Sequence, residues 1–233
     1  MSKYIEGDIH KVIKTFEENT FDLIYTSPPY AITEAVWDKP LEWEQLFTEI
    51  WRVLKPQGIL VLHASMPFTY ELLKYHKPRY HYTWMKNIKT NFFKAKLQPL
   101  RNTEEVFIYY QSQGTYNPQM IGDKWHAKRM VKHGGKEQYW GKRNNKSYVC
   151  KDGQGHYGEY PSTLLKYDVR RNSAITRPDD MIDFFIKTYS NIGDYVLDMT
   201  CYNNMVGDRC EILQRNYVGV DLKLNLNEKI YIC

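Results

Sequence analysis

A short run that can bind an amino group follows the first strongly apolar segment of the sequence. The run is Thr26-Ser27-Pro28-Pro29-Tyr30, directly after the apolar residues 21–25. Two prolines stiffen a loop, and open α/β folds place their ligands at the carboxyl ends of strands. A hydroxyl and backbone carbonyls can accept the two N–H bonds of an exocyclic amine, while an aromatic ring stacks on the attached base. The alternative is a proline-rich turn that binds nothing.

Two acidic residues near the end of the chain suggest a nucleotide half-site. Asp198 ends the apolar run Val196-Leu197, and Asp221 ends a second apolar run 23 residues later. A segment with helical spacing separates the two runs. A carboxylate at the tip of the second strand can accept hydrogen bonds from both hydroxyls of a ribose.

Alternating strands and helices are needed to position these residues. Apolar runs and proline or glycine stops predict strands at 3–5, 21–25, 59–63, 81–85, 105–110, 194–198 and 217–221. Helical spacing predicts helices at 9–19, 43–54, 68–75, 178–191 and 206–215. This order predicts an α/β fold.

The middle of the chain differs from both ends. We divide the sequence into 1–111, an inserted region 112–172, and 173–233. The insertion lacks clear periodicity and interleaves cations with aromatic residues, which suits a surface that grips phosphates and contacts bases. The alternative is a solvated loop. The candidate nucleic-acid-binding residues are Lys124, Lys128, Arg129, Lys132, Lys142 and Arg143.

Composition limits the class of protein. The 233 residues carry a net charge of +5, and 15% of them are aromatic, a combination that suits a polyanion with stackable bases. No apolar run reaches the length of a membrane span, and the amino terminus lacks the apolar core of a signal peptide. We therefore expect no membrane partner and an intracellular location, in the cytoplasm or in a nucleoid or viral context. The four cysteines are too scattered for a disulfide framework, and we expect free thiols and no metal site.

The run Ser27-Pro28-Pro29-Tyr30 resembles motif IV of the DNA amino methyltransferases, (Asp/Asn/Ser)-Pro-Pro-(Tyr/Phe/Trp). Motif IV precedes the cofactor strand here, as in the circularly permuted beta group of that family. Similar runs are Leu54-Lys55-Pro56-Gln57-Gly58, Trp84-Met85-Lys86-Asn87, Arg101-Asn102-Thr103-Glu104-Glu105 and Glu159-Tyr160-Pro161-Ser162. The resemblance covers nearly the whole chain.

The resemblance implies a Rossmann-like class I methyltransferase fold with a mixed, mostly parallel sheet and helices on both faces. It also implies S-adenosylmethionine as cofactor, DNA as substrate and a target-recognition role for the insertion. The implied catalytic residues are Ser27, Pro28, Pro29 and Tyr30, and the implied cofactor-binding residues are Asp8, Ser27, Asp198, Thr200 and Asp221. Asp8 reaches the cofactor adenine because the permuted order puts the first strand beside the last. Its other interpretation is a helix N-cap.

Two segments depart from the family pattern. Where motif I has glycines, this sequence has Tyr202 and Asn204, and we expect the left-handed turn to form at Asn204, since Asn tolerates that conformation. Where the family often has His-Pro-Thr-Gln-Lys-Pro, the sequence has Thr176-Arg177-Pro178.

The sequence therefore favours a site-specific DNA methyltransferase acting on a flipped-out base. Serine at the head of motif IV favours cytosine N4 over adenine N6 within the family. A DNA-binding protein with a decayed methyltransferase fold, and a methyltransferase of RNA or of a small molecule, remain open. So do a homodimer and a cognate restriction endonuclease.

Overall fold

The computed structural model describes residues 2–126, 156–169 and 177–224. It divides into two compact units, one formed by residues 1–117 and 162–233 and one by residues 118–161. Each unit is described by itself below. The second unit, residues 118–161, lies within the insertion 112–172 that the sequence analysis defined.

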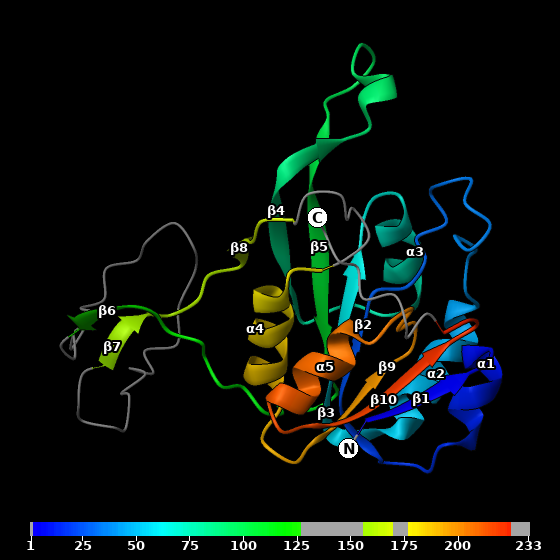
Figure 1. Ribbon diagram of the computed structural model, residues 1–233, viewed down its shortest axis with the longest axis vertical. Coiled ribbons are helices and arrows are strands. Elements are labelled where there is room, and N and C mark those ends of the chain that lie inside the picture. The colour runs from blue at the N-terminus through cyan, green and yellow to red at the C-terminus, as the bar shows by residue number, and fades with distance from the viewer. Residues whose placement is uncertain (1, 127–155, 170–176, 225–233) are drawn as a thin grey trace, which may run out of the picture. The chain divides into compact units, whose positions relative to one another are not determined.

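The first unit is built on an eight-stranded mixed sheet in the order β1-β10-β9-β2-β3-β5-β4-β8 (Figure 1). The strands are β1 (Ser2–Glu6), β2 (Phe21–Thr26), β3 (Leu54–Ala64), β4 (Tyr80–Thr90), β5 (Arg101–Tyr109), β8 (Leu164–Lys166), β9 (Tyr195–Asp198) and β10 (Asn216–Asp221). The first five strands in that order are parallel, and β5 is antiparallel to both β3 and β4. The first strand thus pairs with the last strand of the described residues.

Helices cover both faces of this sheet, as the sequence predicted. They are α1 (Ile9–Val12), α2 (Trp43–Val53), α3 (Phe68–Tyr75), α4 (Asp179–Tyr189) and α5 (Met205–Ile212). Successive strand residues point to opposite faces. Tyr25 packs in one core with Phe185 of α4, whereas Ile24 packs in the other with Ile50 of α2. Figure 1 shows α4 and α5 on one side of the sheet and α1 and α2 on the other.

Several element boundaries differ from the prediction. The predicted helix 9–19 is wrong beyond Thr15, since α1 is followed only by a 3-10 turn over Ile13–Thr15. The segment Leu54-Lys55-Pro56-Gln57-Gly58 ends α2 as expected, but it also begins β3, because Leu54 pairs with Phe21 of β2. Strands β4 and β5 extend beyond the predicted runs and form one long hairpin, in which Thr90 pairs with Arg101.

The second unit contains a two-stranded antiparallel sheet of β6 (Ile121–His126) and β7 (His156–Glu159). Trp125 and Tyr157 lie next to each other across the pair, with ring centroids 4.7 Å apart. Gly158 has φ 78°, and an added Cβ there would lie 2.8 Å from the carbonyl oxygen of Gly122. This close approach of the two strands requires glycine.

Within the described ranges, no helix is long and apolar enough to cross a bilayer. The thiols of Cys201 and Cys210 are buried and free, as predicted, whereas Cys150 and Cys233 lie outside the described residues.

Candidate active site

Both predicted halves of the site lie at the same edge of the main sheet. Since β2, β9 and β10 are adjacent and parallel, their carboxyl ends meet at one edge. Ser27 follows β2, and Asp198 and Asp221 end β9 and β10. The hydroxyls of Thr26 and Thr200 lie 3.0 Å apart and join the two halves directly.

The loop after β2 holds Tyr30 in a fixed position. Pro28 is buried, and the ring of Tyr30 stacks on Phe68 of α3 with centroids 5.4 Å apart and planes inclined by 20°. The Tyr30 hydroxyl donates to Oε2 of Glu104 over 3.3 Å. Burial raises the pKa of Tyr30, although Arg177 opposes this effect, so the hydroxyl stays protonated. One face of the Tyr30 ring is thus covered by protein, and a base can stack only on the other.

Asp38 fixes the turn that follows Tyr30. Its carboxylate accepts backbone N–H bonds from Ala31, Ile32 and Thr33 at 2.7, 3.0 and 2.7 Å. Ala31 adopts φ 53°, a left-handed conformation that these bonds hold in place. Burial alone would raise the pKa of Asp38, but the hydrogen bonds outweigh it and lower the pKa.

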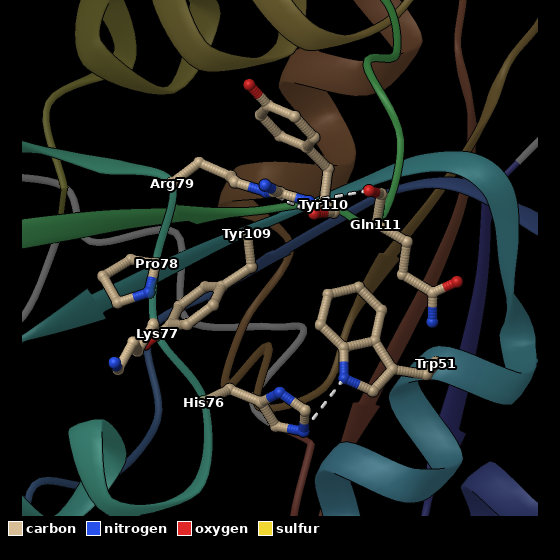
Figure 2. Close-up of a pocket in the computed structure, with 8 residues that line it drawn as sticks. All are labelled: Trp51, His76, Lys77, Pro78, Arg79, Tyr109, Tyr110 and Gln111. Carbon is tan, nitrogen blue, oxygen red and sulfur yellow. Dashed lines mark hydrogen bonds between the residues drawn. The ribbon is translucent and has the colours of Figure 1, made fainter.

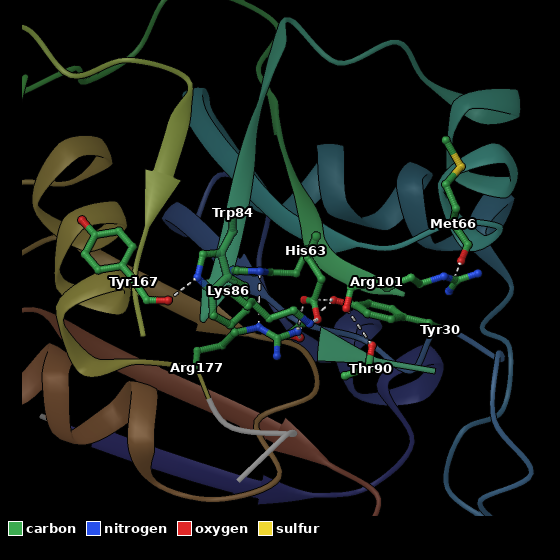
Figure 3. Close-up of polar contacts among 11 residues, drawn as sticks. Tyr30, His63, Met66, Trp84, Lys86, Thr90, Arg101, Tyr167 and Arg177 are labelled. Carbon is green, nitrogen blue, oxygen red and sulfur yellow. Dashed lines mark hydrogen bonds and ion pairs between the residues drawn. The ribbon is translucent and has the colours of Figure 1, made fainter. Parts of the chain in front are cut away.

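An arginine occupies the centre of the predicted catalytic corner. The Nη2 atom of Arg177 donates to Oγ of Ser27 over 2.6 Å and to the hydroxyl of Tyr30 over 2.8 Å. The same Nη2 lies 3.1 Å from Oε2 of Glu104, and the guanidinium lies over the ring of Trp84 at 5.5 Å. Figure 3 shows Arg177 extended between Lys86 and Tyr30. The Arg177 side chain is only 9% exposed, so its guanidinium is part of the site's interior.

Two cations share one carboxylate beneath this corner. Nζ of Lys86 lies 2.5 Å from Oε1 of Glu104, while Arg177 binds Oε2. Burial would raise the pKa of Glu104, but Arg177 and then Lys86 outweigh burial and lower it. Burial lowers the pKa of Arg177, but Glu104, Tyr30 and Tyr25 together outweigh burial, so the net shift is upward. Both partners of the pair are therefore charged.

His63 of β3 is neutral in this environment. Burial lowers its pKa well below the ordinary value, and Arg177 and Lys86 lower it further. Nε of Arg177 donates to Nδ1 of His63 over 3.3 Å, so Nε2 carries the proton and donates to the hydroxyl of Tyr25 over 3.0 Å. His63 thus fixes the guanidinium plane without adding charge.

Asp198 is a buried acid at the tip of β9. Burial raises its pKa to about 7, a hydrogen bond from the backbone N–H of Thr200 opposes the shift, and the charge of Asp221 adds to it. The Thr200 N–H lies 3.2 Å from Oδ1 of Asp198. A cationic ligand placed at this edge would bring the pKa of Asp198 back down.

The turn after β9 forms differently from the prediction. Tyr202, not Asn204, adopts the left-handed conformation, with φ 50° against −84° for Asn204. The Tyr202 N–H donates to Oδ2 of Asp221 over 2.8 Å, and this bond fixes the strained residue. Asn204 instead occupies the N-cap position of α5, and its side-chain amide donates to Asp208. The expectation for Asn204 was wrong, because the hydrogen bond to Asp221 stabilises the left-handed conformation at Tyr202, two positions earlier.

Asp8 lies at the start of α1, beside the end of β1. Its carboxylate caps the helix by accepting the N–H of His10 over 2.9 Å. The preceding Gly7 N–H donates to the carbonyl of Asp221 over 2.8 Å, so this turn lies next to the end of β10. The capping interpretation is confirmed, while cofactor binding by Asp8 stays a prediction.

The predicted DNA-binding residues can be followed only in part. Lys124 is exposed on β6 of the second unit. The other five, Lys128, Arg129, Lys132, Lys142 and Arg143, lie outside the described residues. Among the residues that the structure describes, no cluster of three or more histidine, cysteine or acidic side chains could hold a metal.

A cavity of about 330 Å³ lies away from these residues (Figure 2). Trp51, His76, Lys77, Pro78, Arg79, Tyr109, Tyr110 and Gln111 line it. Tyr109 pairs with Leu60 in β3, and Ser112 bonds to the carbonyl of Pro56, so this hollow lies beside the amino-terminal part of β3. It contains none of the predicted site residues.

The sequence did not assign roles to Arg177, Glu104, Lys86, His63 or Asp38. Signals were present for three of them, because Lys86 and Glu104 belong to runs that resemble the family and Arg177 belongs to a run that departs from it. Their convergence depends on strand pairings between distant segments, which spacing along the chain does not reveal.

Comparisons with known protein sequences give three matches. The sequence profile of an N6 and N4 methyltransferase family, described as DNA methylase, matches residues 21–231. The type II methyltransferase M.HpaI of Haemophilus parainfluenzae is 25% identical over 226 residues, covering 91% of this chain and 67% of that protein. The putative methylase YubD of Escherichia coli K12 is 38% identical over 69 residues, which cover 26% of this chain and 30% of that protein.

Solved structures share the fold. The cytosine-N4-specific PvuII DNA methyltransferase superimposes with a TM-score of 0.64 at 16% identity, covering 95% of this chain and 82% of that one. The complex of M1.HpyAVI with S-adenosylmethionine gives 0.59 at 17% identity, covering 96% and 93%. These likenesses confirm the Rossmann-like methyltransferase fold. The circular permutation stays a prediction.

Proposed function

The chain belongs to the DNA methylase family of N6 and N4 methyltransferases, and from this premise we propose that it methylates DNA with S-adenosylmethionine. The methyl group goes to an exocyclic amine of a flipped-out base, with cytosine N4 favoured over adenine N6. One observation carries the proposal. The loop of Ser27 and Tyr30 and the carboxylates of Asp198 and Asp221 lie at the ends of adjacent parallel strands. An amine acceptor and a nucleotide half-site thus meet at one sheet edge.

The residues at the ends of β9 and β10 fit this cofactor. Asp221 would accept the ribose hydroxyls, because each carboxylate oxygen can take a further bond beside those from the N–H groups of Tyr202 and Lys223. Asp198 and Asp221 provide negative charge for a sulfonium cation, and Thr200 offers a hydroxyl beside them. When bound, S-adenosylmethionine supplies an electrophilic methyl group.

The chain's own residues would prepare the amine for transfer. The hydroxyl of Ser27 and the carbonyl of Pro28 would accept its hydrogens and favour a pyramidal nitrogen, whose lone pair is otherwise delocalised into the ring. The face of the Tyr30 ring opposite Phe68 would stack on the base. Positioning and electrostatics then supply most of the rate, with no covalent enzyme intermediate.

DNA recognition is proposed for the insertion. Exposed Lys124 and Trp125 on β6 support it, because a cation suits a phosphate group and an exposed aromatic ring suits stacking on a base. We extend the proposal to Lys128, Arg129, Lys132, Lys142 and Arg143 on their sequence alone. A homodimer and a partner endonuclease are further proposals that binding assays can address.

The test is incubation of the protein with unmethylated, mixed-sequence duplex DNA and labelled S-adenosylmethionine, followed by mass analysis of the nucleosides. N4-methylcytosine is the expected product, and N6-methyladenine would keep the broader function while overturning the base preference. Calorimetry with the cofactor is run in parallel. Absence of both binding and product would support a decayed fold, and transfer to RNA but not DNA would replace the substrate class.

A further inference from the structure

The hairpin of β4 and β5 projects beyond the sheet edge that holds the candidate site. Ala64, the last residue of β3, pairs with Glu105 of β5. The residues before Glu105 in β5 therefore run past the end of β3, together with the part of β4 that pairs with them. Figure 1 shows both strands continuing past β2 and β3 to a short helical turn. We call residues 91–100 the hairpin tip. Since Ser27 follows β2 at the same edge, the tip extends from the base side of the site.

The arms of the hairpin are fixed up to the point where the tip begins. The hydroxyl of Thr90 on β4 donates to the carbonyl of Arg101 on β5 over 3.3 Å. The guanidinium of Arg101 in turn donates to the carbonyl of Met66 over 2.8 Å (Figure 3). The tip is thus carried on paired strands and not on a free loop.

The length of the hairpin suits a base that has left the duplex. Glu104 of β5 bonds to Tyr30 in the base side, and the strand rises about 10 Å from Glu104 to Arg101. A flipped base is displaced from its stack by a distance of the order of a groove depth, about 8 Å. With the base beside Tyr30, the tip therefore reaches the level of the stack.

Apolar side chains at the tip are exposed. Phe93 is 106% exposed, Leu97 84% and Phe92 65%. They belong to a hydrogen-bonded segment, because Phe92–Lys94 forms a 3-10 turn and the N–H of Ala95 donates to the carbonyl of Phe92 over 3.1 Å. Large apolar side chains gathered on a surface mark a site of interaction.

The charge around the tip favours a polyanionic partner. Lys89, Lys94 and Lys96 are exposed, and the sequence contains no acidic residue from 86 to 103. Cations next to exposed aromatic rings match phosphates next to bases. Many proteins that distort DNA insert an apolar side chain between base steps while cations hold the backbone.

We propose that the hairpin tip is a wedge that enters the DNA duplex at the target base, with Phe93 stacked in the gap that the flipped base leaves. Lys94 and Lys96 bind the phosphates on either side of that gap. The inference rests on the proposed function and adds the element that keeps the base outside the duplex.

The wedge acts on the flipping equilibrium. Rotating a base out of the duplex leaves its neighbours unstacked and its partner unpaired. The ring of Phe93 restores stacking only in the flipped state, so it raises the fraction of bound DNA whose target base lies beside Tyr30. A flat ring stacks on any base, and the wedge therefore works in any flanking sequence.

The experiment compares wild type with Phe93→Ala and Phe93→Trp. After the modified sites are mapped, two duplexes are prepared, with the target base opposite its normal partner or opposite an abasic site. Single-turnover methylation is measured at saturating DNA and cofactor. Tyr195→Ala is the matched control, since Tyr195 is an exposed aromatic residue at the amino end of β9, opposite the site edge. Because Phe93 is fully exposed, its variants should keep the thermal unfolding midpoint of wild type.

We expect Phe93→Ala to lower the rate on the paired target about tenfold or more, with Phe93→Trp and Tyr195→Ala close to wild type. Opposite an abasic site, where flipping costs less, Phe93→Ala should recover to within about twofold of wild type. A merely structural role would not be rescued by a change in the DNA.

Two results would overturn the inference. One is an unchanged rate of Phe93→Ala on the paired target, or an equal loss on both duplexes. The other is loss of binding to phosphatidylserine vesicles by Phe93→Ala with unchanged methylation, which would assign the tip to a lipid surface. Failure of the wild type to methylate either duplex would instead reject the proposed function.

Discussion

The base side and the cofactor side of the site edge are assembled in different ways. On the cofactor side, Asp198, Thr200 and Asp221 come from one strand–helix–strand segment. On the base side, Ser27 and Tyr30 bond to Arg177, and Tyr30 also bonds to Glu104 of β5. Arg177 and Glu104 bond in turn to His63 of β3 and Lys86 of β4. The first arrangement is local in sequence, and the second exists only once distant strands have paired.

Two buried carboxylates show the same contrast in charge. Arg177 and Lys86 surround Glu104 and lower its pKa, whereas burial beside Asp221 raises the pKa of Asp198 to about 7. On the base side the carboxylate is therefore already paired with cations before any ligand binds. The cofactor side is left with acids that a cationic ligand would satisfy.

The largest effect is expected from removing the amine acceptor and the stacking ring. The double variant Ser27→Ala, Tyr30→Ala should lose about 10³-fold or more in kcat, since loss of one positioned transition-state hydrogen bond costs about 10²–10³-fold. Radiolabel transfer to DNA measures it, and the thermal unfolding midpoint checks the fold. Tyr30→Phe keeps the ring and should lose far less. A fully active double variant would remove the base side from the mechanism.

The next effect is a pH dependence of stability that belongs to the cofactor side. In the folded protein the pKa of Asp198 is about 7, against 3.8 ordinarily. Between these values the folded chain holds a proton that the unfolded chain releases, so stability falls as pH rises from about 4 to 7, by about 4 kcal/mol. Asp198→Asn should abolish this fall and be the more stable protein at pH 8 without cofactor, measured by urea unfolding at several pH values.

His63 changes stability in the opposite direction over part of the same range. Its pKa is lowered by folding, so its contribution is present above the unfolded value of about 6.5 and is lost as pH falls. His63 is present in both proteins, and the difference between wild type and Asp198→Asn therefore isolates Asp198. A difference that does not change between pH 4 and 8 would contradict the assigned burial.

These results also indicate what the sequence could predict. The strand-end acids and the Ser27–Tyr30 loop were found because local spacing and turn residues determine such features. The cluster around Glu104 was not, because Lys86 and Glu104 meet through the antiparallel pairing of β4 with β5, and Arg177 reaches them from the far end of the chain. The left-handed residue was misassigned to Asn204 because propensity was overridden by the bond from Tyr202 to Asp221.

A smaller effect should separate binding from chemistry. Asp221→Asn should weaken cofactor affinity about 10–100-fold, because hydrogen bonds to a charged group contribute about 1.5–3 kcal/mol. At saturating cofactor, kcat should change little, since Asp221 lies on the cofactor side. Calorimetry and initial rates give the two quantities. Asp194→Asn, at the opposite end of β9, is the matched control. Equal loss of kcat would show that the two sides are not separable.

The smallest effect concerns the strained turn that anchors Asp221. Tyr202 has φ 50°, a conformation that is unfavourable by about 1–2 kcal/mol for residues with a Cβ. Tyr202→Gly should therefore be more stable than Tyr202→Ala by about 1 kcal/mol, although both remove the ring. At Glu211, exposed within α5, the order should reverse, with Ala more stable than Gly by about 1 kcal/mol. Chemical unfolding of the four variants measures both differences.

Since Tyr202→Gly keeps the N–H that binds Asp221, its cofactor affinity should equal or exceed that of Tyr202→Ala. Equal stability of Tyr202→Ala and Tyr202→Gly would show that the bond to Asp221 does not hold a strained residue. The strands alone would then determine the geometry of the cofactor side.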